Sequence, residues 1–491
     1  MQPIKLAIVH YHLKRGGVTR VIESTIEAAR KHTPELAFTV ISGQNSNAFS
    51  PNIACYEVPA LNYSSKRSCS TSAEQLVEQL KAAAIQGLGS LPDVWHIHNH
   101  SLGKIPAFES AVHQLAQEGA RILLQIHDFA EDGRPKNYTQ LQDKNKLYPL
   151  APGIQYAVIN SRDQQQLQEA GFPDEQLKLL ANPVTAPANT TVPIQAQKQL
   201  LSQLNAERLI VYPVRALRRK NLGEFLLWAA LAEPGEVFAM TLGPTNEAYR
   251  ARYQAWQALS QELALPVHWE IGESTNASFE CIMQSASAIL NTSIAEGFGL
   301  TFLEPWLFAK GLLGRKLPDI TADFKAKGID LSNLYTALPI PKAYICLSDL
   351  EHAIAKGLQQ AYASYQRALP QDAVERALQA IHCGPDHIDF GGLDEAQQTA
   401  IIRQVQQDPS TKNLLKPHLT IQLASTEHIK KNAAAVKTCY NEKTYIQELQ
   451  AIYQQALGHS NSASEYCLKL LPTANVLSRF LKPENFRLLR T

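Results

Sequence analysis

Short apolar runs and amphipathic stretches alternate along the first half of the chain. The first apolar run, residues 6–9, is typical of a buried parallel strand. In residues 18–30, apolar side chains recur at helical spacing on one face and charged side chains occupy the rest, which predicts an amphipathic helix. Further strands are predicted at 38–41, 94–98, 122–127 and 157–160, and a further helix at 73–85. This rhythm predicts a doubly wound parallel sheet.

The alternation is interrupted once and then begins again. Residues 182–195 read NPVTAPANTTVPIQ, a composition suited to a linker between domains. After this segment, strands are predicted at 209–212, 237–242, 267–271 and 288–291, and helices at 221–231 and 247–263. We therefore expect an α/β protein with two Rossmann-like domains, residues 1–185 and residues 196–440. Ligands of such sheets bind beyond the carboxyl ends of the strands, so two facing sheets predict one shared cleft.

The last part of the chain gives weaker signals. Residues 386–440 mix helical and extended patterns, and no element is assigned there. Residues 441–458 carry an apolar stripe at helical spacing, with Asn441 and Gly458 as candidate caps. A short HSNSAS stretch leads from this helix into a basic tail, and residues 441–491 are expected to form a C-terminal extension. The tail either touches a membrane surface or docks onto the first domain, and Pro472 and Pro483 favour docking because they interrupt a long helix.

Composition excludes several classes of protein. The chain has 491 residues, 45% hydrophobic and 19% charged, which is ordinary globular usage. Its net charge of +1 gives no sign of a nucleic-acid partner. The seven cysteines are odd in number and form no C-x-x-C pair, which argues against disulfides and structural zinc. No run of about 18 apolar residues occurs, and the apolar run near the start is too short for a signal peptide, so we expect a soluble cytoplasmic protein.

The strongest candidate for chemistry follows the predicted strand 288–291. There the chain reads AEGFGLTFLE from Ala295 to Glu304. Gly297 and Gly299 allow a ligand to approach the backbone closely, and the amides of the following helical turn would point at an anion. Glu296 on the loop and Glu304 in the early helix would then face one ligand. A plain strand-to-helix turn with capping acids explains the same spacing, and both interpretations stay open.

A second candidate is a group of four cations at the end of strand 209–212. They are Arg215, Arg218, Arg219 and Lys220, placed where a phosphate-bearing ligand would bind. A solvated basic turn is the alternative. Gly16 and Gly17, between the first strand and the first helix, form a weaker anion-binding candidate, for which a plain tight turn is the alternative.

Histidines gather at the ends of two predicted strands. His96, His98 and His100 alternate along one strand, and His127 with Asp128 ends the next. Alternating histidines share a face, so a metal site is conceivable. The plainer interpretation is polar groups that line a cleft or are satisfied in the core, and cleft lining is favoured over a metal. Because no D-x-D pair lies near the phosphate candidates, no metal is predicted.

These motifs together resemble those of the retaining GT-B glycosyltransferases, in particular glycosyltransferase family four. The resemblance spans roughly residues 1–320, and the order of the motifs matches. The residues that carry it are Gly16 and Gly17, His127 with Asp128, Arg215 with Lys220, and Glu296 with Glu304 around a Gly-Phe-Gly-Leu core.

The resemblance implies a nucleotide-diphosphate sugar as donor and no cofactor. Arg215 and Lys220 would neutralise the leaving diphosphate, helped by backbone amides of the N-terminal glycine loop and of the turn after Glu296. The residues with this amide role would be Gly16 and Gly17, and Gly297, Phe298, Gly299, Leu300 and Thr301.

The resemblance also assigns roles around the sugar. Glu304 would accept hydrogen bonds from ribose hydroxyls, Glu296 would hold the donor sugar and stabilise an oxocarbenium-like centre, and His127 would contact the sugar near its C6 oxygen. The acceptor, which the sequence does not identify, would enter from the N-terminal domain, and the anomeric configuration would be retained. The helix 441–458 would cross back to the N-terminal domain.

Some residues depart from the family pattern. Pro305 directly follows Glu304, which is tolerable only where a helix has barely begun. Pro213 and Val214 precede Arg215 where a glycine is common, and residues 311–318 replace the familiar small-residue strand and glycine turn. Two alternatives therefore stay open: an inactive GT-B scaffold or binding protein, and a nucleotide-sugar epimerase.

Overall fold

The chain folds into two compact units. The computed structural model describes residues 3–14, 16–44, 49, 54–62, 71–105, 107–185, 192–458 and 467–490. Unit 1 comprises Met1–Thr185, Ala361–Arg367 and Tyr440–Lys482, and unit 2 comprises Ala186–Gln360, Ala368–Cys439 and Pro483–Thr491. Residues 441–491 are thus divided between the units. The HSNSAS stretch and part of the expected linker, 186–191, lie outside the described residues.

Unit 1 is built on a seven-stranded parallel sheet with the order β3-β2-β1-β4-β5-β7-β8. Its helices and strands are β1 (Ile4–His10), α1 (Gly17–His32), β2 (Leu36–Ser42), β3 (Cys55–Glu57), α2 (Ala73–Leu88), β4 (Val94–His98), α3 (Phe108–Gln117), β5 (Ile122–Ile126), α4 (Pro135–Tyr138), β6 (Pro149–Leu150), β7 (Ile154–Val158), α5 (Ser161–Ala170), β8 (Leu177–Leu179), α18 (Glu442–Leu457), β16 (Lys469–Leu470) and α19 (Thr473–Phe480). The predicted parallel sheet is therefore confirmed for this unit.

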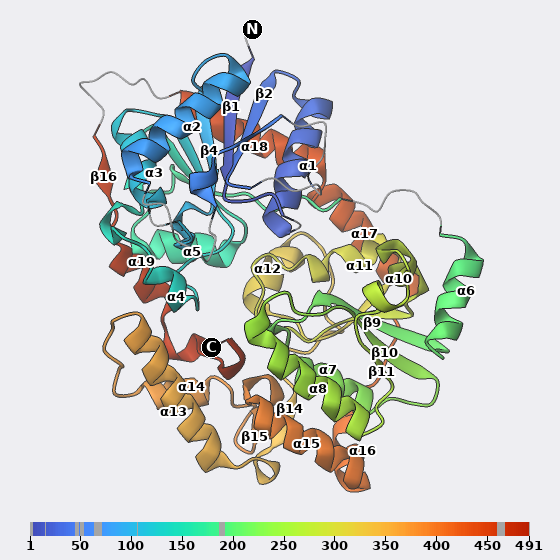
Figure 1. Ribbon diagram of the computed structural model, residues 1–491. Coiled ribbons are helices and arrows are strands. Elements are labelled where there is room, and N and C mark those ends of the chain that lie inside the picture. Colours follow the sequence, from blue (N-terminus) through green and yellow to red (C-terminus); the bar gives the residue numbers. More distant parts are fainter. Residues whose placement is uncertain are drawn as a thin grey trace. The chain divides into compact units, whose positions relative to one another are not determined.

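Helices cover both faces of the unit 1 sheet because successive strand residues point to opposite sides. α2 and α3 lie on one side of the strands, and α1 and α18 lie on the other (Figure 1). Ala7 and Val9 of β1 pack into the cluster that contains α2 and α3, whereas Leu6 packs against α1 and α18. All three side chains are fully buried. The near-continuous apolar runs of the sequence are explained by this burial on two sides.

The helix predicted at 441–458 is α18. Asn441 caps it by accepting a hydrogen bond from the Thr444 backbone amide at 2.9 Å, and it ends directly before Gly458. Its stripe, which includes Tyr445 and Leu449, is buried against the unit 1 sheet and α1. The C-terminal helix therefore completes the fold of the N-terminal unit.

The following part of the tail docks onto unit 1. β16 pairs antiparallel with β6, and the apolar side of α19 packs with α5. Val476 and Leu477 of α19 are buried, and Arg479 pairs with Glu169 at 3.4 Å. The apolar side of this helix is thus already covered by its own unit.

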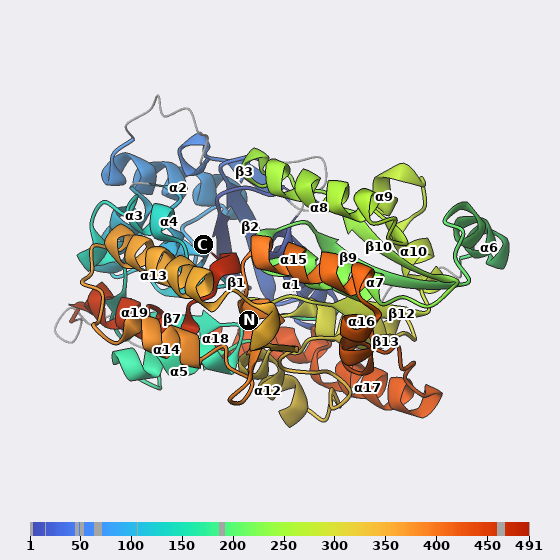
Figure 2. The same ribbon diagram turned by 90° about the horizontal axis from the view of Figure 1, so that it is seen from below.

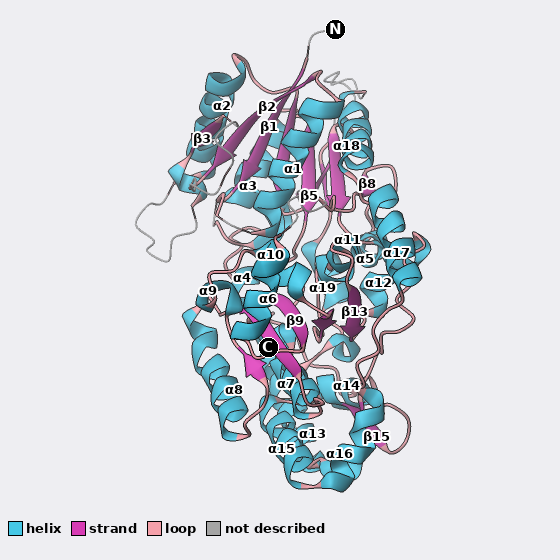
Figure 3. Cartoon of the chain, turned by 90° about the vertical axis from the view of Figure 1, so that its right-hand side faces the viewer, coloured by secondary structure: helices cyan, strands magenta, loops and turns pink. Residues whose placement is uncertain are grey.

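Unit 2 repeats the parallel pattern with five strands in the order β11-β10-β9-β12-β13. Its helices and strands are α6 (Ile194–Gln203), β9 (Arg208–Arg215), α7 (Leu222–Ala230), β10 (Glu236–Leu242), α8 (Arg250–Glu262), β11 (Val267–His268), α9 (Ile271–Ser274), α10 (Phe279–Ser285), β12 (Ala288–Asn291), α11 (Glu304–Leu307), β13 (Gly311–Gly314), α12 (Pro318–Ala326), β14 (Pro339–Pro341), α13 (Leu347–Ser364), α14 (Ala373–Gln379), β15 (His387–Asp389), α15 (Glu395–Gln407), α16 (Pro409–Leu415) and α17 (Thr426–Cys439). The end of α13, residues 361–364, belongs to unit 1. α15 lies along α7 (Figure 2), and helices flank the strands of the sheet (Figure 3).

Three sequence predictions need correction. The strand expected at 157–160 is β7, which ends at Val158 because Asn160 caps α5. The strand expected at 267–271 ends at His268, since Glu270 takes a left-handed conformation with φ of +56° and α9 follows. The expected linker 182–195 is too long by two residues, because α6 begins at Ile194.

One buried network in unit 2 ties β15, near the start of the region that the sequence left unassigned, to α7 and to the end of β13. Arg315, which follows β13, donates hydrogen bonds to Glu224 on α7 at 2.6 Å and to Asp389 on β15 at 2.7 Å. Tyr335 also donates to Glu224, at 2.7 Å.

The described helices include none that is both long and apolar enough to cross a bilayer.

Candidate active site

The cation motif and the Glu296 motif lie side by side in unit 2, because β9 and β12 are neighbouring parallel strands. After β9 the chain forms a short 3-10 turn, Arg218–Lys220, and Asn221 then takes a left-handed conformation with φ of +52° before α7 begins. After β12 the loop with Glu296 leads into a second 3-10 turn, Leu300–Phe302. Both motifs therefore leave the same edge of the sheet.

Buried hydroxyl groups fasten these two loops together. Tyr212 donates to the Lys220 carbonyl at 3.1 Å, and its hydroxyl lies 2.7 Å from the Ser293 hydroxyl. Thr292 also donates to the Lys220 carbonyl, at 3.0 Å. The Ile294 backbone amide donates to the Arg219 carbonyl at 3.0 Å. The backbone that carries the cations is thus held against the loop that carries Glu296.

Glu296 lies between two of the predicted cations. One carboxylate oxygen accepts a hydrogen bond from Lys220 Nζ, and the other accepts one from Arg219 Nη1 at 2.7 Å. Burial favours the protonated acid, but the charges of Lys220 and Arg219 outweigh it and bring the pKa of Glu296 to about 2. Burial lowers the pKa of the Lys220 ammonium, and its attraction to Glu296 opposes that change. The Glu296 carboxylate is therefore ionised at neutral pH.

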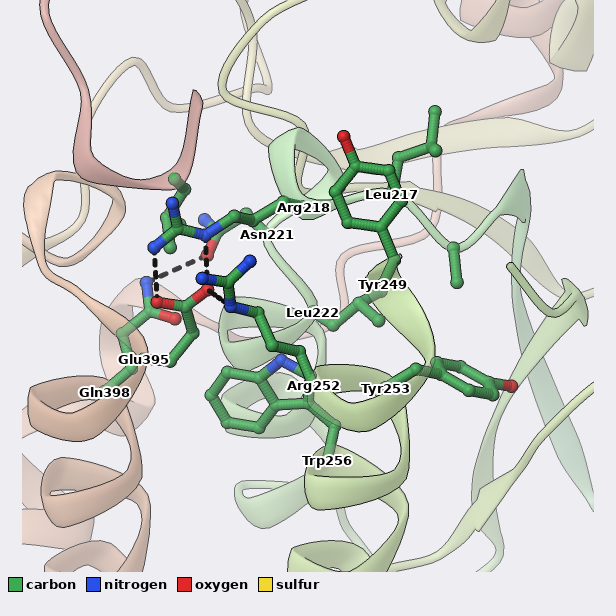
Figure 4. A pocket seen from close by; sticks show the side chains of 12 residues that line it. Leu217, Arg218, Asn221, Leu222, Tyr249, Arg252, Tyr253, Trp256, Glu395 and Gln398 are labelled. Atoms are coloured by element: carbon green, nitrogen blue, oxygen red, sulfur yellow. Dashed lines mark hydrogen bonds and ion pairs between the residues drawn. The ribbon is translucent and has the colours of Figure 1, made fainter. Parts of the chain in front are cut away.

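Arg218 does not belong to this group. Its guanidinium forms a bidentate ion pair with Glu395 of α15, with distances of 2.5 and 2.7 Å (Figure 4). Arg252 approaches the same carboxylate at 3.7 Å. These side chains, with Trp256 and Tyr249, line a hollow of about 370 Å³, a volume that includes the solvent at its mouth. Arg218 is therefore paired with α15, whereas Arg219 and Lys220 are paired with Glu296.

Two groups in the expected diphosphate region, Arg215 and Thr301, are not engaged by the described side chains in the way their neighbours are. The Arg215 guanidinium, at the end of β9, makes no ion pair with the described carboxylates. The Thr301 hydroxyl is buried and lacks a hydrogen-bond partner in the described part of the chain. A buried hydroxyl without a partner is costly, so a ligand that bonds to it would recover that cost.

The glycine turn after Glu296 is close-packed. Gly299 has φ of +91°, and a Cβ there would lie 2.9 Å from Phe302 and 3.2 Å from Ile320. Phe298 is buried against Phe324. Gly297 opens this turn, and Leu300 begins the 3-10 turn that follows. Glycine is required at 299 by the fold itself, whatever a ligand adds.

Glu304 is the first residue of α11, as predicted, and Pro305 is the second. At this position proline is tolerated because its missing amide would have no partner in the helix. The helix has therefore barely begun at Glu304, which removes the objection that Pro305 raised.

In unit 1, Gly16 and Gly17 begin α1. Gly16 is the N-cap residue with extended backbone, and no acidic side chain occupies the first turn. A Cβ built at Gly17 would meet no atom of the described residues within 4 Å, so these residues leave open space there. The positive end of α1 is thus accessible to an anion.

His127 follows β5, and its surroundings fix its orientation. Its backbone amide donates to Asn99 Oδ1 at 2.7 Å, and the Asp128 amide donates to the same oxygen at 3.1 Å. His98 Nδ1 lies 3.0 Å from His127 Nε2. Burial lowers the pKa of His127 to about 3, so the ring is neutral at pH 7.

The histidine row is buried, which corrects the prediction that it lines a cleft. His96, His98 and His100 are each at most 2% exposed, and burial lowers the pKa of all three. His96 is satisfied by the Tyr453 hydroxyl at 2.7 Å and by Gln125 Oε1 at 2.8 Å. Across the described ranges, no group of three or more ligating side chains is arranged to hold a metal ion.

Sequence reasoning did not identify the residues that hold the site residues in place. Thr292 and Ser293 directly follow β12, and Asn99 directly follows β4, so their places at strand ends were available as a signal. Glu395 had no such signal, because it begins a helix in the unassigned region.

Comparison with known proteins bears on the fold and on the kind of enzyme that the chain resembles. No protein-family model matches the chain. HepE of Anabaena, in a complex with UDP-glucose, has a TM-score of 0.55 at 12% identity, over 92% of this chain and 99% of that chain. Sucrose-phosphate synthase of Thermosynechococcus elongatus has a TM-score of 0.56 at 14% identity, over 93% and 100%. The chain has the GT-B fold. The predicted resemblance to GT-B glycosyltransferases is thereby confirmed.

A curated relative with this resemblance is mannosylglucosyl-3-phosphoglycerate synthase of Petrotoga mobilis. It is 28% identical over 339 residues, and the match covers 65% of this GT-B chain and 66% of the relative, slightly less than two thirds of each. The retaining mechanism and the roles of the individual residues stay predictions.

Proposed function

We propose that this GT-B protein is a retaining glycosyltransferase that moves a sugar from a nucleotide-diphosphate sugar to an acceptor hydroxyl. One observation carries the proposal: in unit 2, Glu296 is held by Lys220 and Arg219 at the ends of neighbouring strands. Arg215, the last residue of β9, lies at the same edge of the sheet and makes no ion pair with a carboxylate of the described residues. Charged groups fixed in advance around developing charge are the usual source of catalysis in such sites.

Unit 2 would bind the donor. Arg215 and Lys220 would neutralise the diphosphate, and the orphan Thr301 hydroxyl offers it a hydrogen-bond donor. Glu304, at the start of α11, would take ribose hydroxyls, and Glu296, ionised at neutral pH, would hold the donor sugar and stabilise positive charge on its ring. Because two fixed cations would take the charge of the leaving group, we propose that no divalent ion is required and that a chelator leaves transfer unchanged.

Transfer would break the bond between the sugar C1 and the diphosphate oxygen. The diphosphate oxygen would leave with the electron pair of that bond, and the acceptor oxygen would form the new bond to C1 on the same face and pass its proton to the departing diphosphate. Unit 1 would contribute His127 to the transferred sugar and the open N-terminus of α1 at Gly17 to the diphosphate.

Unit 1 also favours an acceptor with a phosphate or carboxylate group. Lys104 is half-buried beyond β4, and its pKa is lowered by burial and by the positive charge of Arg134, which follows β5. Asp128 pairs with Arg134 and offsets one of these charges. The positive charges of Lys104 and Arg134 would attract an anionic group on the acceptor. The name of the Petrotoga relative includes 3-phosphoglycerate, which has both a phosphate and a carboxylate group, and this agrees with an anionic acceptor.

The test is a panel of nucleotide sugars assayed by nucleotide release, with and without acceptor alcohols that do or do not carry phosphate. We expect release with one donor, dependence on an acceptor, and an anomeric configuration in the product, read by NMR, equal to that of the donor. Arg215→Ala should abolish release while the control Arg252→Ala, an exposed arginine of the same unit, should not.

Other outcomes would support the other interpretations. A protein whose melting temperature responds to no nucleotide would be an inactive scaffold, because a ligand that binds the folded state raises that temperature. Release without acceptor, together with an altered sugar, would indicate an epimerase. Inversion of configuration would reject the retaining mechanism alone.

A further inference from the structure

His98 and His127 form a pair of imidazoles at the ends of the neighbouring strands β4 and β5 in unit 1. His98 Nδ1 lies 3.0 Å from His127 Nε2, and the rings stack with centroids 5.2 Å apart and planes inclined by 20°. Because His98 is bonded to Nε2 of His127, the other ring nitrogen of His127, Nδ1, is the one that can bind a ligand. The backbone of His127 is held separately by Asn99.

Both rings are neutral, so one of two tautomer pairs must be present. The neighbours of His98 are other imidazoles, with His96 stacked on it at 4.3 Å and His10 edge-on at 6.1 Å. Burial and these neighbours lower the pKa of His98 well below its usual value, and burial keeps His127 uncharged as well. A hydrogen bond between two neutral rings has one N–H donor and one lone-pair acceptor.

The second nitrogen of His98 decides which ring donates. Nε2 of His98 is buried and has no partner in the described part of the chain. If His127 donated from Nε2, His98 would have to carry its proton on this orphan nitrogen. If His98 donates from Nδ1, the orphan nitrogen holds only a lone pair. Buried N–H groups without an acceptor are rarer than acceptors without a donor, which favours donation by His98.

We propose that His98 is a positioning residue that fixes His127 in the tautomer with its proton on Nδ1. His127 then presents an N–H donor to its ligand, and it recognises an oxygen lone pair. That the ligand is the transferred sugar rests on the proposed function; the tautomer itself does not. A histidine's free nitrogen is commonly set in this way by the bond that the other nitrogen makes.

The direct test is ¹⁵N NMR of the histidine rings in the ligand-free full chain, with His127 assigned from the spectrum of His127→Gln. We expect Nδ1 of His127 to be protonated and Nε2 bare in the unmodified protein. In His98→Leu the preference should be lost, so that both nitrogens show exchange-averaged shifts. A proton on Nε2 of His127 in the unmodified protein, or an unchanged tautomer in His98→Leu, would overturn the proposal.

Kinetics provide the second readout. For the donor that the panel identifies, His98→Leu should lower kcat/KM about tenfold, the factor that corresponds to one hydrogen bond of about 1.4 kcal/mol. His98→Asn should recover most of this loss, because its amide places an N–H near the position of Nδ1. His113→Asn, which removes a buried histidine of α3, is the matched control and should leave kcat/KM unchanged.

The two proposals fail separately. If no nucleotide sugar is used, the proposed function fails while the ring spectrum still decides the tautomer. If transfer occurs but the ring spectrum shows the proton on Nε2, the glycosyltransferase stands and the role of His98 does not. Equal losses in His98→Asn and His98→Leu would also count against positioning, because they would indicate a requirement for the imidazole itself.

Discussion

Replacing Glu296 by glutamine should destabilise unit 2 at neutral pH. The fall of the Glu296 pKa from 4.5 to about 2 corresponds to about 3 kcal/mol of unfolding free energy, at about 1.4 kcal/mol for each factor of ten. Glu296→Gln also leaves the buried Lys220 ammonium without its carboxylate. We therefore expect the unfolding free energy of the variant to be about 3 kcal/mol lower at pH 7.

The stabilisation that the Glu296 carboxylate provides depends on pH in a predictable direction. The folded-state pKa of Glu296 lies below its unfolded value of 4.5, so its stabilisation is fully present above pH 4.5. It is lost as the pH falls from 4.5 toward 2, because the carboxylate must then be protonated. The difference between the original protein and Glu296→Gln should therefore narrow as the pH is lowered through this range.

Tryptophan fluorescence during denaturant unfolding suits this measurement. Four of the five tryptophans, Trp228, Trp256, Trp269 and Trp306, belong to unit 2. The matched control is Glu395→Gln, which removes the less buried ion pair with Arg218 and should cost about 1 kcal/mol or less. Equal stability of Glu296→Gln and the original protein at pH 7, or a difference that does not narrow in acid, would refute this account of the ion pair.

Three further predictions test other parts of the structure. Thr301→Val should leave stability unchanged, because the hydroxyl has no protein partner, yet weaken nucleoside diphosphate binding several-fold by calorimetry; a loss of stability with unchanged binding would contradict this. Gly299→Ala should lower the unfolding free energy by about 1–3 kcal/mol through strain at positive φ and contact with a phenyl ring, whereas Gly17→Ala should not, as thermal melts would show. Glu224→Ala should lower the unfolding free energy by about 3–5 kcal/mol, because it leaves Arg315 buried without this carboxylate. A melting temperature within 1 °C of that of the unmodified protein would contradict the stabilising role of this network.

The sequence was informative where local pattern and topology act together. Apolar runs identify the buried parallel strands, and neighbouring parallel strands bring their carboxyl ends to one edge. That is why Lys220, after β9, meets Glu296, after β12, although 76 residues separate them. The same reasoning predicts α18 from its stripe, because the period of that stripe matches a helix with one buried side.

Directions of individual side chains were not predictable in this way. Arg218 and Arg219 are neighbours with the same chemistry, but one binds Glu395 on α15 and the other binds Glu296. Their separation follows from the 3-10 turn and from a helix 177 residues away. The burial of His96 likewise depends on Tyr453, 357 residues later in the chain, which no local pattern reveals.

The central claim is that the cations after β9 bind the diphosphate of an activated sugar. Titration calorimetry with UDP and GDP on the original protein, Arg215→Ala and the control Arg252→Ala measures this directly. The account predicts that one nucleotide binds to the original protein and to Arg252→Ala, and that Arg215→Ala binds it at least tenfold more weakly. Binding of equal strength to all three proteins, or to none of them, would contradict it.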